Sequence, residues 1–351
     1  MEHHVRRCHD EQYINCTRFA FYSEFNKTLA VTVVETFFLC LVFVLSWLTN
    51  VCAIVLLVKK KRLVTSNCFV LNLFCADLIF VSMIPFIIVV RWTEKWILGH
   101  FVCHLLFYVM VLSGCVILTS LSAVSLERML CITKLRQTTK CNVKVVTLGL
   151  VVIWGFAAMT ALPLCLFFRI IPQTVDDSRV LVCALVWPTV TEEIGWDISF
   201  IILDFLIPGM SIVVSYSKIY KITKDIRKKM ISSIAYSDIH QIRVSQRDYK
   251  LFRTLFILMI SFFVMWTPVF VVVLLILLQN LDEDFVLSPT AFFWISVFTF
   301  SNSIVNPVLY NLNLFRQNWW QVLFCCNPEE CVDTETTTKK NENPNPTTEK
   351  K

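Results

Sequence analysis

Charged residues and glycine are both scarce in this sequence. Only 17% of its 351 residues are charged and only 6 are glycine, whereas 56% are hydrophobic. This composition excludes an ordinary soluble domain and is typical of a polytopic membrane protein. The opening stretch, MEHHVRRCHDEQYINC, has no apolar core. We therefore expect no cleavable signal peptide, and we expect the first hydrophobic segment to direct insertion.

Long hydrophobic runs are what the sequence has in abundance. A helix needs roughly 20 consecutive apolar residues to cross the hydrocarbon core of a bilayer. Seven runs of about this length are separated by charged or turn-rich loops. We therefore predict an all-α membrane protein, a seven-transmembrane helix bundle. The predicted spans cover residues 32–58, 67–90, 102–132, 143–168, 196–219, 251–278 and 289–312.

Basic residues predict how the bundle is oriented. They gather in the first, third and fifth connections, as in KKKR at residues 59–62, and cytosolic loops are enriched in such residues. These loops face anionic lipid, which accounts for the net charge of +6 without a nucleic-acid partner. The N-terminus is then extracellular, and we expect a multi-pass protein of the plasma membrane.

The chain divides into four predicted parts. Residues 1–31 form an extracellular tail, and residues 32–312 form the bundle. Residues 313–326 place apolar side chains on one face at helical spacing, which predicts an amphipathic helix at the membrane surface. Residues 327–351 are too polar to bury a core, so we expect a disordered cytoplasmic tail.

Several residues are candidates for covalent modification. Cys103 and Cys183 lie in an oxidising compartment, where a bridge between them would tie the second outer loop across the third span. Cys8 and Cys16 are a second candidate pair. The other predicted sites are Asn15 and Asn26 for glycosylation, Cys325 and Cys326 for acylation, and Thr334, Thr336, Thr337 and Thr338 for phosphorylation. A plain solvated tail explains the threonine cluster equally well.

Ionisable side chains inside apolar spans are costly, and they mark candidate functional sites. Asp77, in the second span, either holds the bundle together by hydrogen bonds or forms an ion or proton site. Asn50, Asn302 and Asn306 on other spans are its potential partners.

Arg128 closes the third span and lies roughly one membrane thickness from Cys103, at about 1.5 Å per residue. A pair with Asp248 would latch the cytosolic ends of the third and sixth spans together. An ordinary interfacial arginine is the competing interpretation. Pro208, Pro268 and Pro307 fall within spans. Kinked helices make a switching bundle more plausible than a rigid scaffold.

Short motifs then occur in a fixed order along the spans: LNLFCAD in the second, LERM at the end of the third, MWTP in the sixth and NPVLY in the seventh. Together they resemble the rhodopsin family of G-protein-coupled receptors over the whole bundle. Glu127, Met129 and Met265 depart from the common form of that family. The resemblance implies an activation switch made of Asp77, Glu127, Arg128, Tyr216, Asp248, Trp266, Pro268, Asn306 and Tyr310.

Longer stretches are similar to receptors for long-chain free fatty acids, among them VLNLFCADL, CHLLFYVM, AVSLERM, HQIRVSQ and NPVLYN. The similarity runs from about residue 17 to residue 326, and the tail beyond has no obvious match. It implies binding of medium- to long-chain free fatty acids and coupling to heterotrimeric G proteins, mainly Gq/11 with some Gi. It also implies arrestin recruitment, with passage to endosomes after activation.

A fatty-acid site needs a long apolar slot and a partner for the carboxylate near water. Phe107, Met110, Val111 and Gly114 recur at helical spacing in the third span, so they form one stripe. Packing against lipid or other helices is the competing explanation for each aromatic residue alone. The ligand-binding residues predicted with the help of the resemblance are Arg91, Trp96, Phe107, Met110, Val111, Gly114, Trp187, Trp196, Phe200, Asp204, Trp266, Phe270, Phe292, Phe293 and Arg18.

Arg91, at the outer end of the second span, is the predicted partner of the carboxylate. An alternative stays open, because a salt bridge to Glu35 would occupy Arg91. Arg18, or less directly Arg169, would then hold the acid. Asp204 stands where the similar receptors have an amide, and its carboxylate would repel an ionised ligand.

An enzyme is not expected, because no nucleophile lies beside a base on one face, and no cofactor is predicted. His100, Cys103 and His104 have ligand-like spacing, but Cys103 is assigned to the bridge, so no metal site is predicted. The alternatives are a receptor of the same fold for another lipid, a peptide or an amine, and a lipid carrier. An amine receptor is disfavoured because no acidic residue lies near Met110. A peptide receptor is disfavoured because the second outer loop is too apolar for the wide polar opening that peptide receptors usually have.

Overall fold

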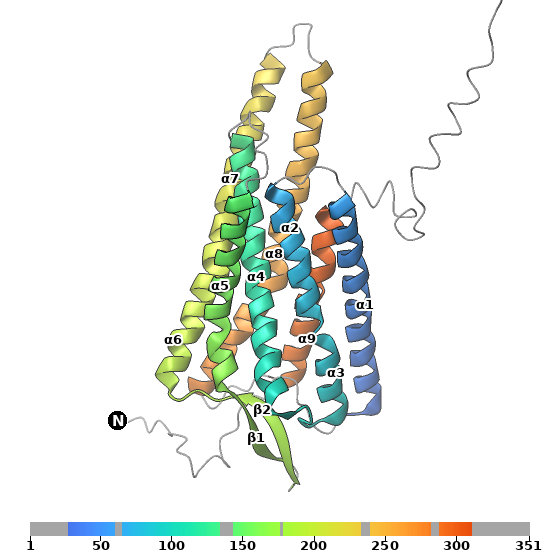
Figure 1. Cartoon of the computed structure of the whole chain (residues 1–351), viewed down its shortest axis with the longest axis vertical. Coiled ribbons are helices and arrows are strands. Elements are labelled where there is room, and N and C mark those ends of the chain that lie inside the picture. The colour runs from blue at the N-terminus through green and yellow to red at the C-terminus, as the bar shows by residue number, and fades with distance from the viewer. Residues whose placement is uncertain are drawn as a thin grey trace, which may run out of the picture. The chain divides into compact units, whose positions relative to one another are not determined.

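The structure is a computed structural model, and it describes residues 27–59, 65–133, 143–175, 178–232, 239–281 and 288–310. Within these ranges, seven helical segments are long and apolar enough to cross a membrane. The seven-transmembrane bundle predicted from the hydrophobic runs is therefore confirmed. The helices run side by side, and α7 and α8 reach farthest at one end (Figure 1). The elements are α1 (Leu29–Lys59), α2 (Thr65–Val81), α3 (Ile84–Thr93), α4 (Gly99–Thr133), α5 (Val143–Phe167), β1 (Phe168–Val175), β2 (Ser178–Leu185), α6 (Val190–Phe200), η1 (Ile201–Leu206), α7 (Ile207–Ser232), α8 (Ile239–Leu281) and α9 (Pro289–Phe300).

Prolines fall where the spans change geometry. Pro85 lies in the first turn of α3, directly after the break that separates α3 from α2 in the second span. Proline lacks a backbone N–H, which the first turn of a helix tolerates and its interior does not. Pro208 follows the π-helical turn η1, so the fifth span consists of α6, η1 and α7. Pro268 lies inside α8. The break before Pro85 is not among the predicted features.

A disulfide holds a two-stranded sheet over the end of the third span. Strand β1 continues directly from α5 and pairs antiparallel with β2. Cys183 in β2 is bonded to Cys103 at the beginning of α4, and their Cα atoms are 5.8 Å apart. The predicted bridge is therefore present. It keeps the hairpin at the end of the bundle where α4 begins (Figure 1).

A cluster of hydrogen-bonded polar side chains joins α1, α2 and the seventh span in the interior. The Asn50 amide donates to the carbonyl oxygens of Ser46 and Ser303, at 2.8 Å each. Ser303 Oγ and Asn306 Nδ2 donate to the two carboxylate oxygens of Asp77, at 2.8 and 3.1 Å. Both carboxylate oxygens of Asp77 therefore accept a hydrogen bond, as its structural interpretation predicts.

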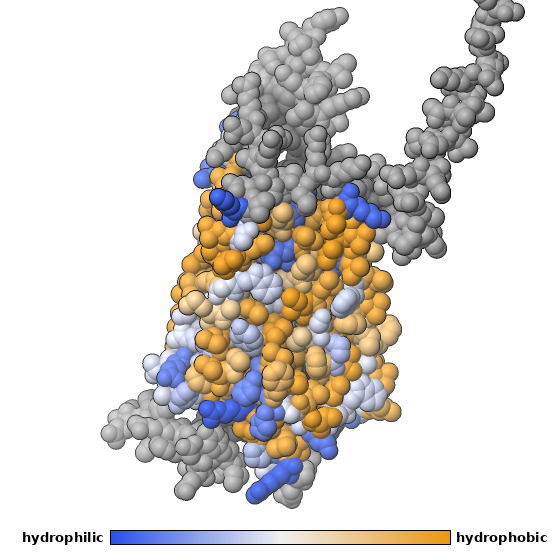
Figure 2. Space-filling view, viewed as in Figure 1, coloured by the Kyte–Doolittle hydropathy of each residue, from blue (hydrophilic) through white to orange (hydrophobic). Residues whose placement is uncertain are grey.

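The outer surface of the helices is apolar. Large side chains such as Phe37, Leu148 and Met159 are exposed. On the face drawn in Figure 2, hydrophobic residues cover most of the helices, and hydrophilic ones gather toward the two ends. This surface has the distribution that a protein in a lipid bilayer requires.

Several predictions lie outside the described residues. They concern the amphipathic helix and tail beyond residue 310, and the side chain of Asp248, which belongs to α8 but is not described beyond its backbone. The remaining such residues are Cys8, Asn15, Cys16, Arg18, Asn26, Cys325, Cys326, Thr334, Thr336, Thr337 and Thr338.

Candidate ligand cavity

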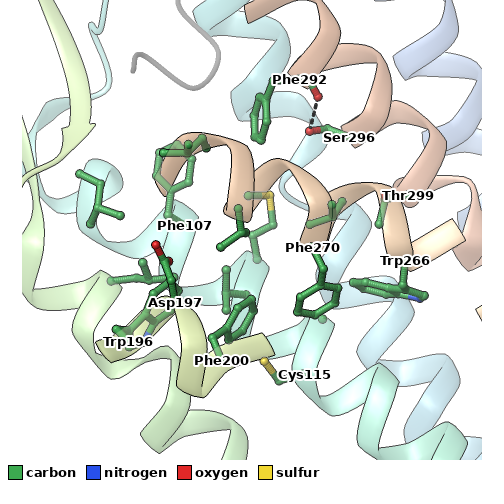
Figure 3. Close-up of a pocket in the computed structure, with 18 of the residues that line it drawn as sticks. Phe107, Cys115, Trp196, Asp197, Phe200, Trp266, Phe270, Phe292, Ser296 and Thr299 are labelled. Atoms are coloured by element: carbon green, nitrogen blue, oxygen red, sulfur yellow. Dashed lines mark hydrogen bonds between the residues drawn. The ribbon is translucent and has the colours of Figure 1, made fainter. Parts of the chain in front are cut away.

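A cavity lies between the helices beneath the hairpin, in the half of the bundle that the disulfide marks as outer (Figure 3). Its volume is about 150 Å³. Roughly 10–15 Å³ is enough for one water molecule, so the space is suited to a ligand rather than to isolated solvent. Side chains of α4, α6, α8 and α9 form most of the wall. The rest comes from α2, α5, β1, β2 and the loop that follows β2.

Most of the predicted pocket residues line this one cavity. The helical stripe of the third span faces it as a unit, because residues three, four and seven apart share one helix face. The predicted residues that line the cavity are Phe107, Met110, Val111, Gly114, Trp187, Trp196, Phe200, Trp266, Phe270 and Phe292.

Aromatic rings form a continuous ladder along one wall. The Trp187 and Trp196 centroids are 5.5 Å apart, and Trp196 stacks on Phe200 at 4.8 Å. Phe200 is followed by Phe270 of α8 at 5.2 Å. Trp196 and Phe200 stack because residues four apart on a helix are neighbours. Ring faces and edges carry opposite partial charge, so this wall is more polarisable than an aliphatic one.

Trp266 closes the inner end of the cavity. A Cβ atom at Gly114 would lie 3.3 Å from Cη2 of its indole, so the glycine lets the ring lie directly against α4. The other side of the indole faces Phe80, with centroids 5.8 Å apart. Any ligand that reaches this floor therefore touches the residue predicted to switch the receptor, and Pro268 follows in the same helix.

Arg91 does not line the cavity. Its guanidinium is buried and donates two hydrogen bonds to the Glu35 carboxylate, one of them from Nε at 2.9 Å. Lys27 Nζ adds a third contact to Glu35 at 3.1 Å. The guanidinium carbon also lies 4.4 Å from the ring centre of Phe293. The alternative left open by the sequence is thus the arrangement observed, in which Arg91 is paired with Glu35. Phe293 packs on that pair instead of facing the cavity.

Two further predicted residues lie beside the cavity without lining it. Trp96 is buried under the hairpin, where its backbone N–H donates to the Leu181 carbonyl at 2.7 Å. Asp204 is fully buried in η1, and Thr160 Oγ1 is 3.4 Å from one of its oxygens. Cys115 contacts the Asp204 carboxyl and does line the cavity. Asp204 therefore lies one side chain behind the wall.

At the inner end of the bundle, the predicted switch residues are near one another but only partly joined. Arg128 Nε is 4.0 Å from the carboxylate of the adjacent Glu127. The Tyr216 and Ser125 hydroxyls are 2.9 Å apart, and Tyr310 packs edge-on against Phe74.

Comparison with known proteins settles the family. The family described as 7 transmembrane receptor (rhodopsin family) matches residues 49–310. The chain belongs to this receptor family. It is 51% identical to free fatty acid receptor 4 of Mus musculus over 342 residues, which is 95% of this chain and 94% of the mouse receptor. The Rattus norvegicus free fatty acid receptor 4 is also 51% identical, over 94% of this chain and 93% of its own. Galanin receptor type 1 of the rat is 27% identical over 82% of each chain.

Both resemblances seen in the sequence are therefore confirmed. The chain is a G-protein-coupled receptor and a multi-pass membrane protein, and it is a receptor rather than an enzyme. The matched residues begin in α1 and end in the seventh span, so they include every element that lines the cavity.

Two acidic residues of the receptor's cavity, Glu193 and Asp197, are absent from the sequence prediction. The predicted fifth span begins at residue 196, so it includes Asp197 but not Glu193. In the structure α6 begins earlier, and Thr189 Oγ1 caps it by accepting a hydrogen bond from the Glu192 N–H at 3.2 Å. A threonine followed three residues later by glutamate is a known helix-start signature. That signal would have placed Glu193 on the helix as well; Asp197 already lies inside the predicted span, but its type and position do not show that it faces a cavity.

The other cavity residues that the prediction omits are mostly aliphatic and aromatic. Their types occur throughout the spans, so nothing in the sequence singles them out. They are Phe80, Cys115, Leu118, Leu164, Phe168, Leu185, Val269, Val273, Ile276, Ser296, Thr299 and Phe300.

Proposed function

We propose that this receptor binds medium- to long-chain free fatty acids in the cavity from the extracellular side and activates a heterotrimeric G protein. Gq/11 is the proposed main class, with some Gi coupling, arrestin recruitment and passage from the plasma membrane to endosomes. The supporting observation is the 51% identity to free fatty acid receptor 4 over nearly the whole of both chains.

The chemistry of the cavity suits the tail of such a ligand. Each methylene group moved from water into an apolar site contributes about 0.8 kcal/mol, which is about fourfold in affinity. Potency should therefore rise steeply with chain length until the space is filled. The ladder of Trp187, Trp196, Phe200 and Phe270 adds polarisable ring faces, which favour the double bonds of an unsaturated chain over saturated methylenes.

Trp266 connects the ligand cavity to the cytosolic half of the receptor. Its indole lines the cavity, and Pro268, two residues farther along α8 toward the outer end, interrupts the hydrogen-bond ladder of the helix. A chain end that presses on the indole would bias α8 between two arrangements, and α8 continues to the cytosolic end of the bundle. Differential contact with one arrangement is what a ligand needs in order to shift the balance.

The test is a calcium response in cells that express the full chain, exposed to albumin-free fatty acids of graded length and unsaturation. We expect about fourfold higher potency per added methylene, up to a plateau, and a further gain from double bonds. Phe200→Ala should lower the potency of all long chains at normal surface expression. Phe37→Ala is the matched control, because Phe37 is exposed on the lipid-facing surface. A response that does not depend on chain length, or equal losses in both variants, would contradict the proposal.

A further inference from the structure

The Asp197 carboxylate is the unusual polar group of the cavity. Its residue is only 6% exposed, and it lies on α6 next to Trp196. In Figure 3 the carboxylate points into the cavity between Trp196 and Phe107. Among the residues that the structure describes, no hydrogen bond or ion pair reaches this carboxylate. A buried carboxylate normally has a partner, because losing its hydration costs several kcal/mol.

No described cavity residue can supply a positive charge to this group. The ionisable side chains of the described lining are Asp197, Glu193 and Cys115, and none of these is basic. Arg91 is committed to Glu35 elsewhere. The Ser296 and Thr299 hydroxyls donate to backbone carbonyls, Ser296 at 2.9 Å to Phe292. The Asp197 carboxylate itself therefore favours a hydrogen-bond donor from the ligand and disfavours an anion beside it, while the indole N–H groups of Trp187 and Trp266, unpartnered among the described residues, are the donors of this cavity wall.

We propose that Asp197 is the head-group site of the cavity and selects long-chain lipids whose head group donates a hydrogen bond. This rests on the proposed function in placing the ligand here, and it adds which head groups are accepted. A primary amide meets the requirement at any pH. A fatty acid meets it only if one proton is shared between its carboxyl group and that of Asp197, because two like charges at hydrogen-bond distance repel each other. An ester accepts hydrogen bonds but donates none.

The shared proton makes fatty-acid binding pH-dependent. If both carboxyl groups are ionised when apart, the complex takes up one proton, and affinity rises by up to about tenfold for each unit that the pH falls. Glu193 lies one turn earlier on α6 and also lines the cavity. Among the α4 residues that line the cavity only Cys115 is ionisable, and the described lining residues of α2, α5, α8, α9 and the hairpin carry no ionisable group. Amide binding involves no such proton and should change little.

The test uses cells expressing the full chain and three probes with the same acyl chain: oleic acid, oleamide and methyl oleate. In the unmodified receptor, oleamide should be about tenfold or more stronger than the ester. Only oleic acid should gain potency as the extracellular pH falls. Asp197→Asn places a donor opposite the ionised acid, so the acid should gain about tenfold at neutral pH and lose its pH dependence. Asp197→Leu should weaken oleamide.

Asp204→Asn is the matched control, because it removes a buried carboxyl group that does not line the cavity. It should keep the original ranking of the three probes. If the acid acts and Asp197→Asn leaves its ranking and pH dependence unchanged at equal surface expression, the head-group assignment is wrong while the proposed function stands. If oleamide acts through Asp197 and no fatty acid acts at any pH, the proposed function is wrong and the assignment stands. Silence toward all three probes would overturn both.

Discussion

Two carboxyl groups buried in the outer half of the bundle have opposite surroundings. Glu35 of α1 accepts hydrogen bonds from Arg91 and lies 3.1 Å from Lys27. Asp197 of α6 is also buried, but it faces a cavity and has no partner among the described residues. A paired ionic group of this kind joins helices, here α1 and α3. An unpaired one lowers stability unless something else binds to it. The difference indicates that Glu35 belongs to the frame of the receptor and Asp197 to its ligand site.

The largest expected effect comes from breaking the paired group. Arg91→Ala would leave the Glu35 carboxylate buried without the hydrogen bonds from Arg91. Breaking a buried pair of this type lowers the free energy of unfolding by about 3–5 kcal/mol. Glu35→Ala should cost a similar amount, and the double variant should cost little more than either, because the two residues act as one unit. The measurement is thermal unfolding of the purified receptor, with surface expression in cells.

The same variants decide whether Arg91 also holds the ligand. If Arg91 were the carboxylate anchor, Glu35→Ala would free its guanidinium and leave or improve the response to fatty acids, whereas Arg91→Ala would abolish it. We expect parallel losses instead. If the dose-response curves of the two variants differ at matched expression, Arg91 binds the ligand, and the contrast drawn between Glu35 and Asp197 is wrong.

A second paired acid should show an intermediate effect. Asp77→Asn keeps the shape of the side chain but replaces one acceptor, so a donor of Ser303 or Asn306 loses its partner at a cost of about 1–3 kcal/mol. Asp204→Asn should lower the free energy of unfolding by less. One Asp204 oxygen has no hydrogen-bond partner, and the amide oxygen of the asparagine can still accept the hydrogen bond from Thr160 Oγ1. Unfolding midpoints of the two variants test this order. Equal losses would mean that burial, and not pairing, sets the cost.

Hydrophobic patterns predict the frame and much of the cavity wall. Seven apolar runs cannot satisfy their backbone groups in lipid except as helices, so the bundle follows from length alone. Phe107, Met110, Val111 and Gly114 share a face because helical periodicity requires it. Facing residues such as Phe200 and Phe270 come together only through the packing of α6 against α8, and the family resemblance supplied that arrangement.

What the sequence left open depends on local geometry or on side-chain partners. The structure begins α6 at Val190, before the predicted start of the fifth span, and Glu193 lies in that additional turn. Asp197 lies inside the predicted span, but the sequence does not show which way its side chain points. Arg91 had two credible partners, and only the three-dimensional arrangement of α1 and α3 distinguishes Glu35 from a ligand. A charge pattern shows that a group needs a partner but does not show which one it finds.

The smallest expected effect compares two tryptophans of the aromatic ladder. Trp196 Nε1 donates to the Thr160 carbonyl at 3.0 Å, whereas Trp187 Nε1 is buried without a hydrogen-bond partner. Trp196→Phe should therefore destabilise the unliganded receptor by about 1 kcal/mol beyond its loss of packing, and Trp187→Phe should cost less. With a saturating fatty acid, the difference in destabilisation between the two variants should become smaller or change sign if the head group accepts a hydrogen bond from Trp187. Thermal unfolding with and without oleic acid measures both orders. A ligand-independent difference would mean that Trp187, like Trp196, stabilises the bundle and does not bind the head group.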